Sequence, residues 1–220
     1  MLIKALTRDN AMFRVANPGD TLATQESPFA ITTVGNGTLA AASLLASIIN
    51  RTGPTAAYTD TTDTAANLML ALSIPVSPVG LVTTASPLVQ VGDTWRLRYV
   101  NTVAFAATIA GGTGVTVTYP TVNASSVKDF LLTCTAGGEQ TTATVSQTNG
   151  SAVLTGMSLQ QTQLLSINQT VTGSGLSGII ISIQQGVGCT LSAAATSTLA
   201  INAATFSPSF TMAGIGQSLL

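Results

Sequence analysis

The chain carries no charged side chain after Glu139. Residues 140–220 contain no Lys, Arg, Asp, Glu or His, whereas the surface of a water-soluble domain is roughly a quarter to a third charged. General acid–base catalysis needs a titratable side chain, and this stretch offers only Cys189. Neutralising phosphate needs Lys or Arg, and the stretch has neither. It therefore predicts a hydroxyl-covered β-structure that works by contact with another surface.

The rest of the composition points to the same fold class. Thr is abundant, and it favours strands because its β-branched side chain fits a pleated surface and can turn its hydroxyl to water. Gly and Pro are frequent enough to supply many turns. The chain is thus predicted to be all-β with many short strands, one short helix and an N-terminal arm. The spacing of roughly ten residues between the strands expected in the second module suits a β-sandwich or a barrel. We expect the arm over residues 1–33, a β-sandwich module over 34–137, and a second, nearly uncharged β module over 138–220.

The first segment differs from the rest because it concentrates charge. Lys4, Arg8 and Arg14 lie there together with three acidic residues. We interpret residues 1–33 as an arm that docks on a partner or a neighbouring subunit, with these three cations as candidate contacts. The alternative is a first β-hairpin of the main domain, in which case the cations are merely solvated.

Several functional classes are excluded or disfavoured. The formal net charge of −1 gives no reason to expect nucleic-acid or membrane binding. The chain has no His, which excludes Ser–His–Asp and Cys–His nucleophile arrangements and the usual zinc sites. We therefore expect neither enzymatic activity nor a cofactor. The most apolar run, Leu39–Ile49, is too short to span a bilayer, and we expect no secretory signal at the start. Cys134 and Cys189 lie in apolar contexts, which favours buried free thiols over a bridge.

The local patterns predict individual elements. Asp63 is a good N-cap for a helix in which Ala65, Leu68 and Leu72 share one face, and Pro75 ends it. In Asp93–Val100, residues alternate so that Trp95, Leu97 and Tyr99 face one side and Arg96 and Arg98 the other, which indicates a half-buried strand. Residues 44–50 are predicted to be a buried segment that ends in a strand. Further strands are predicted at 103–109, 115–119, 129–133, 143–147, 152–154, 164–168, 179–184, 190–193, 199–202 and 210–213.

A few residues invite a functional interpretation, and each has a simpler one. Asp60 and Asp63 could ligate a hard cation, but too few carboxylates accompany them. A glycosidase needs two carboxylates; Asp60 with Asp63, or Asp93 with Asp129, could supply a pair, but no cleft motif surrounds either.

Three other features have the same double interpretation. The run Gly111-Gly112-Thr113-Gly114 is similar to a phosphate loop but lacks the following Lys, so a β-turn is favoured. Arg96 and Arg98 could hold an acidic neighbour or a sugar, or form a solvated face. Trp95 could stack on a glycan, but its position on the apolar side of the strand favours the core.

Two stretches resemble modules of tailed-bacteriophage structural proteins. The first comprises SIINRTGPTAAYTDTTDTAANLMLAL (Ser47–Leu72) and VGDTWRLRYVNTVAFAATIAGGTGVTV (Val91–Val117); it has an R-S/T-G-P turn and a T-D-T-T segment, and departs from the pattern by doubling Gly at 111–112. The second is VTGSGLSGIIISIQQGVGCTLSAAATSTLAINAATFSP (Val171–Pro208), with Leu176 where that module has Ile. Together they cover about two-fifths of the chain.

The resemblance implies a head decoration, or cement, protein on the outer surface of a phage capsid. Similar proteins are β-sandwiches, often jelly-roll-like, assembled as trimers, so the resemblance implies a jelly-roll-like β-sandwich. The implied partners are the major capsid protein and further copies of this chain. The implied location is the virion, after synthesis in the bacterial cytoplasm. The alternative is a fibre or spike component that recognises a host-surface glycan, although the chain shows no long repeats and few aromatic residues. An enzyme such as a glycan depolymerase and a secreted bacterial surface protein are further alternatives.

Overall fold

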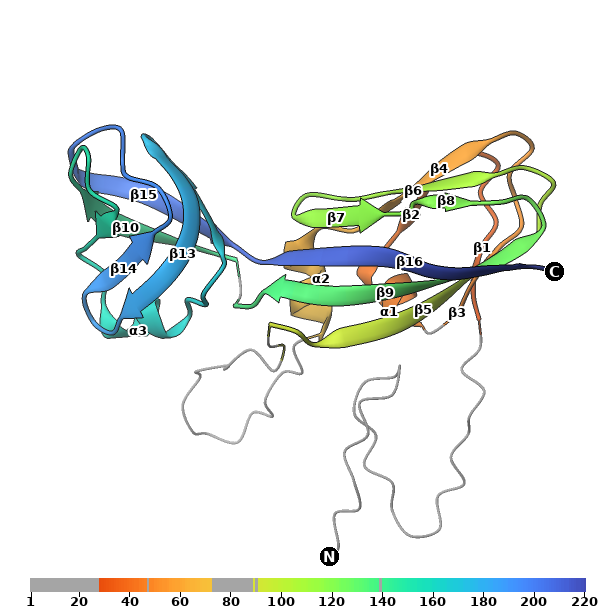
Figure 1. The fold of residues 1–220 in the computed structure, drawn as a ribbon, viewed down its shortest axis with the longest axis horizontal. Helices are drawn as coiled ribbons and strands as arrows, with labels where there is room; N and C mark the ends of the chain where they lie inside the picture. Colours follow the sequence, from red (N-terminus) through yellow and green to blue (C-terminus); the bar gives the residue numbers. More distant parts are fainter. Residues whose placement is uncertain (1–27, 47, 73–88, 90, 139) are drawn as a thin grey trace, which may run out of the picture. The chain divides into compact units, whose positions relative to one another are not determined.

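The computed structural model describes residues 28–220, except 47, 73–88, 90 and 139. The predicted arm therefore falls mostly outside the described residues, and so do Lys4, Arg8 and Arg14. The described part is predominantly β-structure, which confirms the all-β prediction (Figure 1). The predicted short helix is confirmed as α2 (Ala65–Leu72), which buries Ala65, Leu68, Met69 and Leu72. The prediction of a single helix was wrong, since α1 (Ala41–Leu45) and α3 (Leu159–Gln163) are also present.

The chain forms two compact units, each built from separate segments. Unit 1 comprises residues 1–64, 94–133 and 211–220, and unit 2 comprises residues 65–93 and 134–210. The chain passes into unit 2 after residue 64 and returns to unit 1 at residue 94. It leaves unit 1 again within β9 (Ser126–Ala136) and returns within β16 (Ser209–Leu219). The two predicted modules, 34–137 and 138–220, are each a single continuous stretch of chain, and so differ from these units. Local sequence patterns give no sign that the last ten residues return to the first unit.

Unit 1 is a sandwich of two sheets, confirming the predicted architecture at that level (Figure 1). The first sheet has the order β1 (Phe29–Ile31), β3 (Ile48–Arg51), β5 (Thr94–Asn101), β9 (Ser126–Ala136), β16 (Ser209–Leu219), β7 (Val115–Thr118). The second has the order β2 (Gly37–Leu39), β4 (Tyr58–Thr62), β6 (Ala107–Ala110), β8 (Thr121–Val122).

From β1 to β6 the chain alternates between these two sheets, so that the neighbouring strands of this part are parallel. β1, β3 and β5 pair in parallel in the first sheet, and β2, β4 and β6 do so in the second. Antiparallel pairing appears where β8 joins β6 and where β9 joins β5. This pairing differs from a jelly roll, which is an antiparallel architecture. Connections between parallel strands are long, and here each connection contains a strand that belongs to the opposite sheet.

The interior of unit 1 follows from strict alternation along its strands. β9 alternates between buried and half-buried residues over its whole length, and β4 does so over five residues. Leu97 and Tyr99 of β5 face inward as predicted, opposite Phe130 and other buried residues. The strand predicted over 103–109 begins only at Ala107, because the amide of Asn101 binds the carbonyl of Phe105 and holds the preceding residues in a loop.

Unit 2 contains a closed antiparallel barrel. Its sheet has the order β10 (Thr141–Gln147), β15 (Leu199–Ser207), β12 (Thr170–Gly173), β13 (Leu176–Gln184), β14 (Gly188–Leu191), β11 (Val153–Leu154). The two ends meet through Ser146 and Thr155, whose backbones exchange hydrogen bonds of 2.8 and 3.0 Å. The strands curve around one another at the left of Figure 1. This closing bridge covers part of the strand edges that an uncharged, Thr-rich sheet would otherwise offer for aggregation.

The barrel interior is apolar, and one prediction beside it was wrong. Leu154, Val171, Ile180 and Phe206 are fully buried members of one cluster. The segment 164–168 was predicted as a strand but forms the turn after α3. A capping box at Ser158 and Gln161 starts that helix, each side chain binding the other residue's backbone N–H.

Both cysteines are free and buried, which confirms the prediction. Burial raises the pKa of Cys134 to about 12 and that of Cys189 to about 11. With a pKa near 11, a thiol at pH 8 is ionised in only about one molecule in a thousand. We therefore expect Ellman's reagent at pH 8 to leave both thiols of the native protein unmodified over minutes and to label both in guanidinium chloride. Rapid labelling of the native protein would contradict this burial.

Candidate interaction surfaces and the buried motif residues

The turn and T-D-T-T motifs of the sequence meet in a buried ion pair. Arg51 ends β3 and Asp60 lies at the centre of β4, so the two come from different sheets of unit 1. Arg51 Nε lies 3.0 Å from Asp60 Oδ2, and both side chains are 0% exposed. The guanidinium also lies over the ring of Tyr58, 4.8 Å from its centroid. The ion pair therefore connects the two layers of the sandwich.

Two tyrosines and an asparagine extend this pair into a network. Tyr99 Oη donates to Asp60 Oδ2 at 2.5 Å, and Tyr58 Oη donates to Asn101 Oδ1 at 2.9 Å. Burial, and then the hydrogen bond to Asp60, raise the pKa of Tyr99 well above its ordinary value, so its hydroxyl stays a donor. Burial also raises the pKa of Tyr58. The two tyrosine hydroxyls therefore act as fixed hydrogen-bond donors in this network.

Arg51 uses its remaining donors to fix the chain around β1 and β2. Nη1 donates to the carbonyls of Ile31 and Thr33, at 3.3 and 2.6 Å, and Nη2 donates to that of Gly35. Gly53 of the same motif is required by space, because a Cβ there would lie 2.0 Å from the carbonyl oxygen of Thr32. The residues of the R-T-G-P turn thus have structural roles.

The carboxylates considered for a cation or a glycosidase pair are already engaged. Asp60 is fully buried, so it cannot contact a substrate. Asp63 Oδ1 accepts the backbone N–H of Thr64, just before α2, and Oδ2 accepts that of Ala41 in α1 at 3.0 Å. No group of three or more His, Cys, Asp or Glu side chains within the described ranges could hold a metal ion.

The glycine run is a turn, as predicted. Val115 N–H donates to the carbonyl of Gly112 at 2.9 Å, and Gly114 has a φ of 77°. The backbone N–H of Gly112 donates to Thr62 Oγ1 at 2.8 Å. The run therefore connects β6 to β7 and binds the end of β4.

On the outer face of the first sheet, two arginines share one carboxylate. Arg98 Nε and Nη2 lie 2.9 and 3.3 Å from the two oxygens of Asp129, and Arg96 Nη2 lies 2.5 Å from Oδ2. The hydrogen bond from Arg98 is the main cause that lowers the pKa of Asp129, and the same bond raises the pKa of Arg98. Arg96 and Arg98 are 52% and 50% exposed, whereas Asp129 is 15% exposed.

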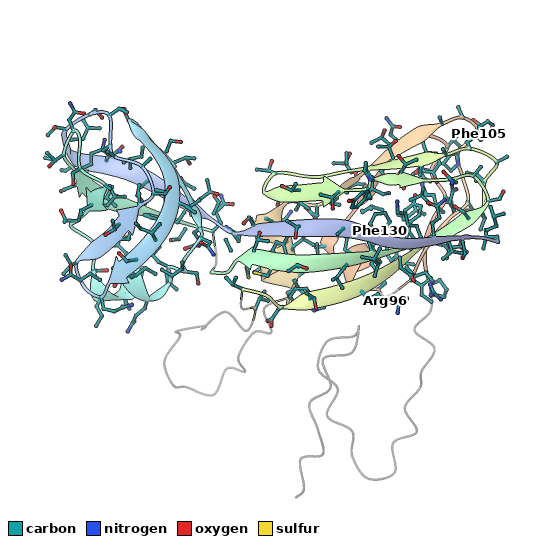
Figure 2. All side chains as sticks on the ribbon, in the orientation of Figure 1. Arg96, Phe105 and Phe130 are labelled. Carbon is teal, nitrogen blue, oxygen red and sulfur yellow. The ribbon has the colours of Figure 1, made fainter. Side chains whose placement is uncertain are left out.

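The arginines were predicted either to hold an acidic neighbour or a sugar, or to form a solvated face, and the structure agrees in part with both. They do hold an acidic neighbour, but it is Asp129 of the same chain, the direct cross-strand partner of Arg98. In Figure 2, Arg96 lies on the outside of the sheet and Phe130 between the layers. Trp95, on the opposite side of β5 from Arg96, is half-buried. The sequence did not reveal Asp129 as the third member because strand register is not visible in a local pattern.

Sequence reasoning also missed a buried lysine. Lys128 of β9 faces the interior, and its Nζ donates to the carbonyls of Tyr119 and Thr121 at 2.6 and 2.7 Å. Burial lowers its pKa, and the ammonium lies 5.5 Å from the ring centroid of Phe130. The alternation of side chains along a strand could have revealed this burial. Lys128 is two residues from Phe130 and so shares its face of the strand.

The barrel of unit 2 offers a surface of hydroxyl and aliphatic groups. Ile181, Val153 and Ile201 are exposed, at 53%, 47% and 78%. Its buried polar groups satisfy one another: Asn202 Nδ2 donates to Gln147 Oε1 at 2.5 Å, and Gln147 Nε2 donates to the carbonyl of Ser174. This unit can therefore bind by shape, hydrogen bonding and apolar contact, but not by ion pairing through its barrel.

Comparison with protein-family models, curated proteins and solved structures finds no match to this chain. Among the helices that the structure describes, none is long and apolar enough to cross a membrane. The function is therefore inferred from the residues and their geometry.

Proposed function

We propose that this protein is a virion structural protein that binds the outer surface of a phage capsid and stabilises it by clamping neighbouring capsomers. The observation that carries the proposal is the charge-free barrel of unit 2. The one ionisable side chain of the barrel strands is the buried thiol of Cys189, so the barrel can bind only by contact and hydrogen bonding. A surface of this kind suits permanent attachment, because burying an unpaired charge in an interface costs several kcal/mol, about 3–5.

The resemblance to phage structural modules supports the same proposal. Two residues that carry the resemblance, Arg51 and Asp60, form the buried ion pair that joins the two sheets of unit 1. A third, Gly53, packs closely against the backbone of Thr32. We further propose a homotrimer, with the major capsid protein as the other partner. Lys4, Arg8 and Arg14 remain candidate capsid contacts, and they lie outside the described residues.

The experiment that tests this function is a measurement of copy number. Quantitative mass spectrometry of purified virions should find hundreds of copies of the chain, in a simple ratio to the major capsid protein. A handful of copies would favour the fibre or spike alternative, and complete absence from the virion would overturn the proposal. Empty shells prepared in parallel provide the control, because a capsid-surface protein should be present whether or not DNA is packaged.

A further inference from the structure

Exposed charge in the described part of the chain is confined to one place. Arg51, Asp60 and Lys128 are buried, and Asp63, Asp93 and Asp129 are at least partly covered. Within the described ranges, only Arg96 and Arg98 are charged side chains in the exposed class, and they lie two residues apart on the outer face of β5. With Asp129 they carry a formal charge of +1. This cluster therefore holds the well-exposed charged side chains of the surface that the structure describes.

The geometry of Arg98 leaves part of its guanidinium available. Nε and Nη2 bind the two oxygens of Asp129, while Nη1 takes part in none of these bonds. The bidentate contact fixes the plane of the guanidinium, so the side chain loses little further freedom when Nη1 binds a second acceptor. Asp129 thus positions Arg98 for an anionic group without neutralising both arginines.

The cluster is surrounded by aliphatic side chains on the same face. In the sheet register, Leu131 lies opposite Arg96 on β9, and Ile48 lies beside Arg98 on β3. Both are half-buried, as are Val100 and Val127, which form the next cross-strand pair on this face. Arginine within an apolar surround is the composition that protein–protein interfaces favour at their centres.

The charges indicate what kind of molecule this face would bind. None of the Asp and Glu residues that the structure describes is in the exposed class, so the described surface of a second copy has no well-exposed carboxylate to offer. Nucleic acid is a poor match, because tracking a phosphate backbone takes a row of cations rather than two arginines that share one carboxylate. A protein surface with carboxylates beside apolar side chains fits both the charge and the surround.

We propose that the outer face of β5 and β9 is a docking face for an acidic protein surface, with Arg98 as its central contact. The inference rests on the proposed function, since the acidic surface is then that of the capsid shell. It adds a second attachment point to the candidate contacts in the N-terminal segment and places it on a rigid sheet.

The test uses the full chain and purified capsids that lack it, with binding followed by co-sedimentation at 50 and 300 mM NaCl. Arg98→Gln removes one positive charge from the face. Thr108→Glu is the matched control: Thr108 is exposed on β6 of the other sheet, and its replacement shifts the net charge by the same amount. Thermal unfolding of each variant, followed by circular dichroism, checks that it is folded; Arg96 still pairs with Asp129 when Arg98 is lost.

We expect Arg98→Gln to raise the dissociation constant about tenfold or more at low salt and to reduce its salt dependence, and Thr108→Glu to change it less than about threefold. Arg98→Lys should give an intermediate loss, because it keeps the charge but not the planar fork. Equal effects of Arg98→Gln and Thr108→Glu, with wild type bound, would overturn the docking face and leave the proposed function standing. No binding of wild type would overturn both, and Arg98-dependent binding of a DNA duplex would overturn the choice of partner.

Discussion

Replacing Arg51 by Met is expected to lower the free energy of unfolding of unit 1 by about 3–5 kcal/mol. The substitution leaves the Asp60 carboxylate in a fully buried site with Tyr99 as its remaining donor, and Asp60 Oδ1 already lacks a hydrogen-bond partner among the described residues. It also removes the donors that hold the carbonyls of Thr33 and Gly35. Breaking one side of a buried pair is costly because the other charge stays in a low-dielectric site.

The single Trp and all three Tyr residues of the chain belong to unit 1, so fluorescence during denaturant unfolding reports on this unit alone. Arg96→Met is the matched control, since it removes the same type of side chain from an exposed ion pair; we expect it to cost less than about 1 kcal/mol. A loss for Arg51→Met no larger than that of the control would show that the buried pair does not stabilise the sandwich.

The double variant Arg51→Met with Asp60→Leu separates the charge from the packing. If the cost of Arg51→Met comes from the stranded carboxylate, removing that carboxylate should recover part of the lost stability, because apolar replacements of buried pairs are often tolerated. If the cost comes from the lost carbonyl contacts of Arg51, the double variant should be no better than the single one.

The local elements were predictable where one residue pattern had one structural meaning. β5 followed from the alternation around Leu97 and Tyr99, and α2 from apolar residues at helical spacing. The all-β class followed from Thr, Gly and Pro content. The segment 164–168 was mispredicted because a short apolar run is compatible with a strand, and the capping box at Ser158, which indicated a helix just before it, was overlooked.

Strand pairing was not predictable in the same way. The parallel pairs of unit 1 place β3 beside β5, which lie more than forty residues apart in the chain, and no local pattern encodes that register. For the same reason Asp60 could be interpreted as a surface ligand: its burial depends on Arg51, which is brought opposite it only when the two sheets pack. The closure of the barrel at Ser146 and Thr155 likewise depends on a long-range pairing.

Phe206→Ala is expected to destabilise the barrel of unit 2 by about 3–5 kcal/mol. Phe206 is 0% exposed and belongs to the same apolar cluster as Cys189, in a chain with few aromatic residues to fill a core. Unit 2 contains no Trp or Tyr, so labelling of its two buried thiols is the suitable measurement. A loss of this size should speed native-state labelling of Cys189 roughly a hundredfold or more, because each 1.4 kcal/mol changes the open population about tenfold.

Ile201→Ala supplies the control on the same strand, because Ile201 is 78% exposed on β15. Substitutions at such positions are usually within about 0.5 kcal/mol, so Cys189 should label at close to the wild-type rate. If Phe206→Ala also labels at the wild-type rate, the barrel is not stabilised by its apolar interior. Because a charge-free barrel has no ion pairs to compensate for a lost aromatic side chain, its stability should depend on this core more than that of an ordinary domain does, and the pair of variants measures that dependence directly.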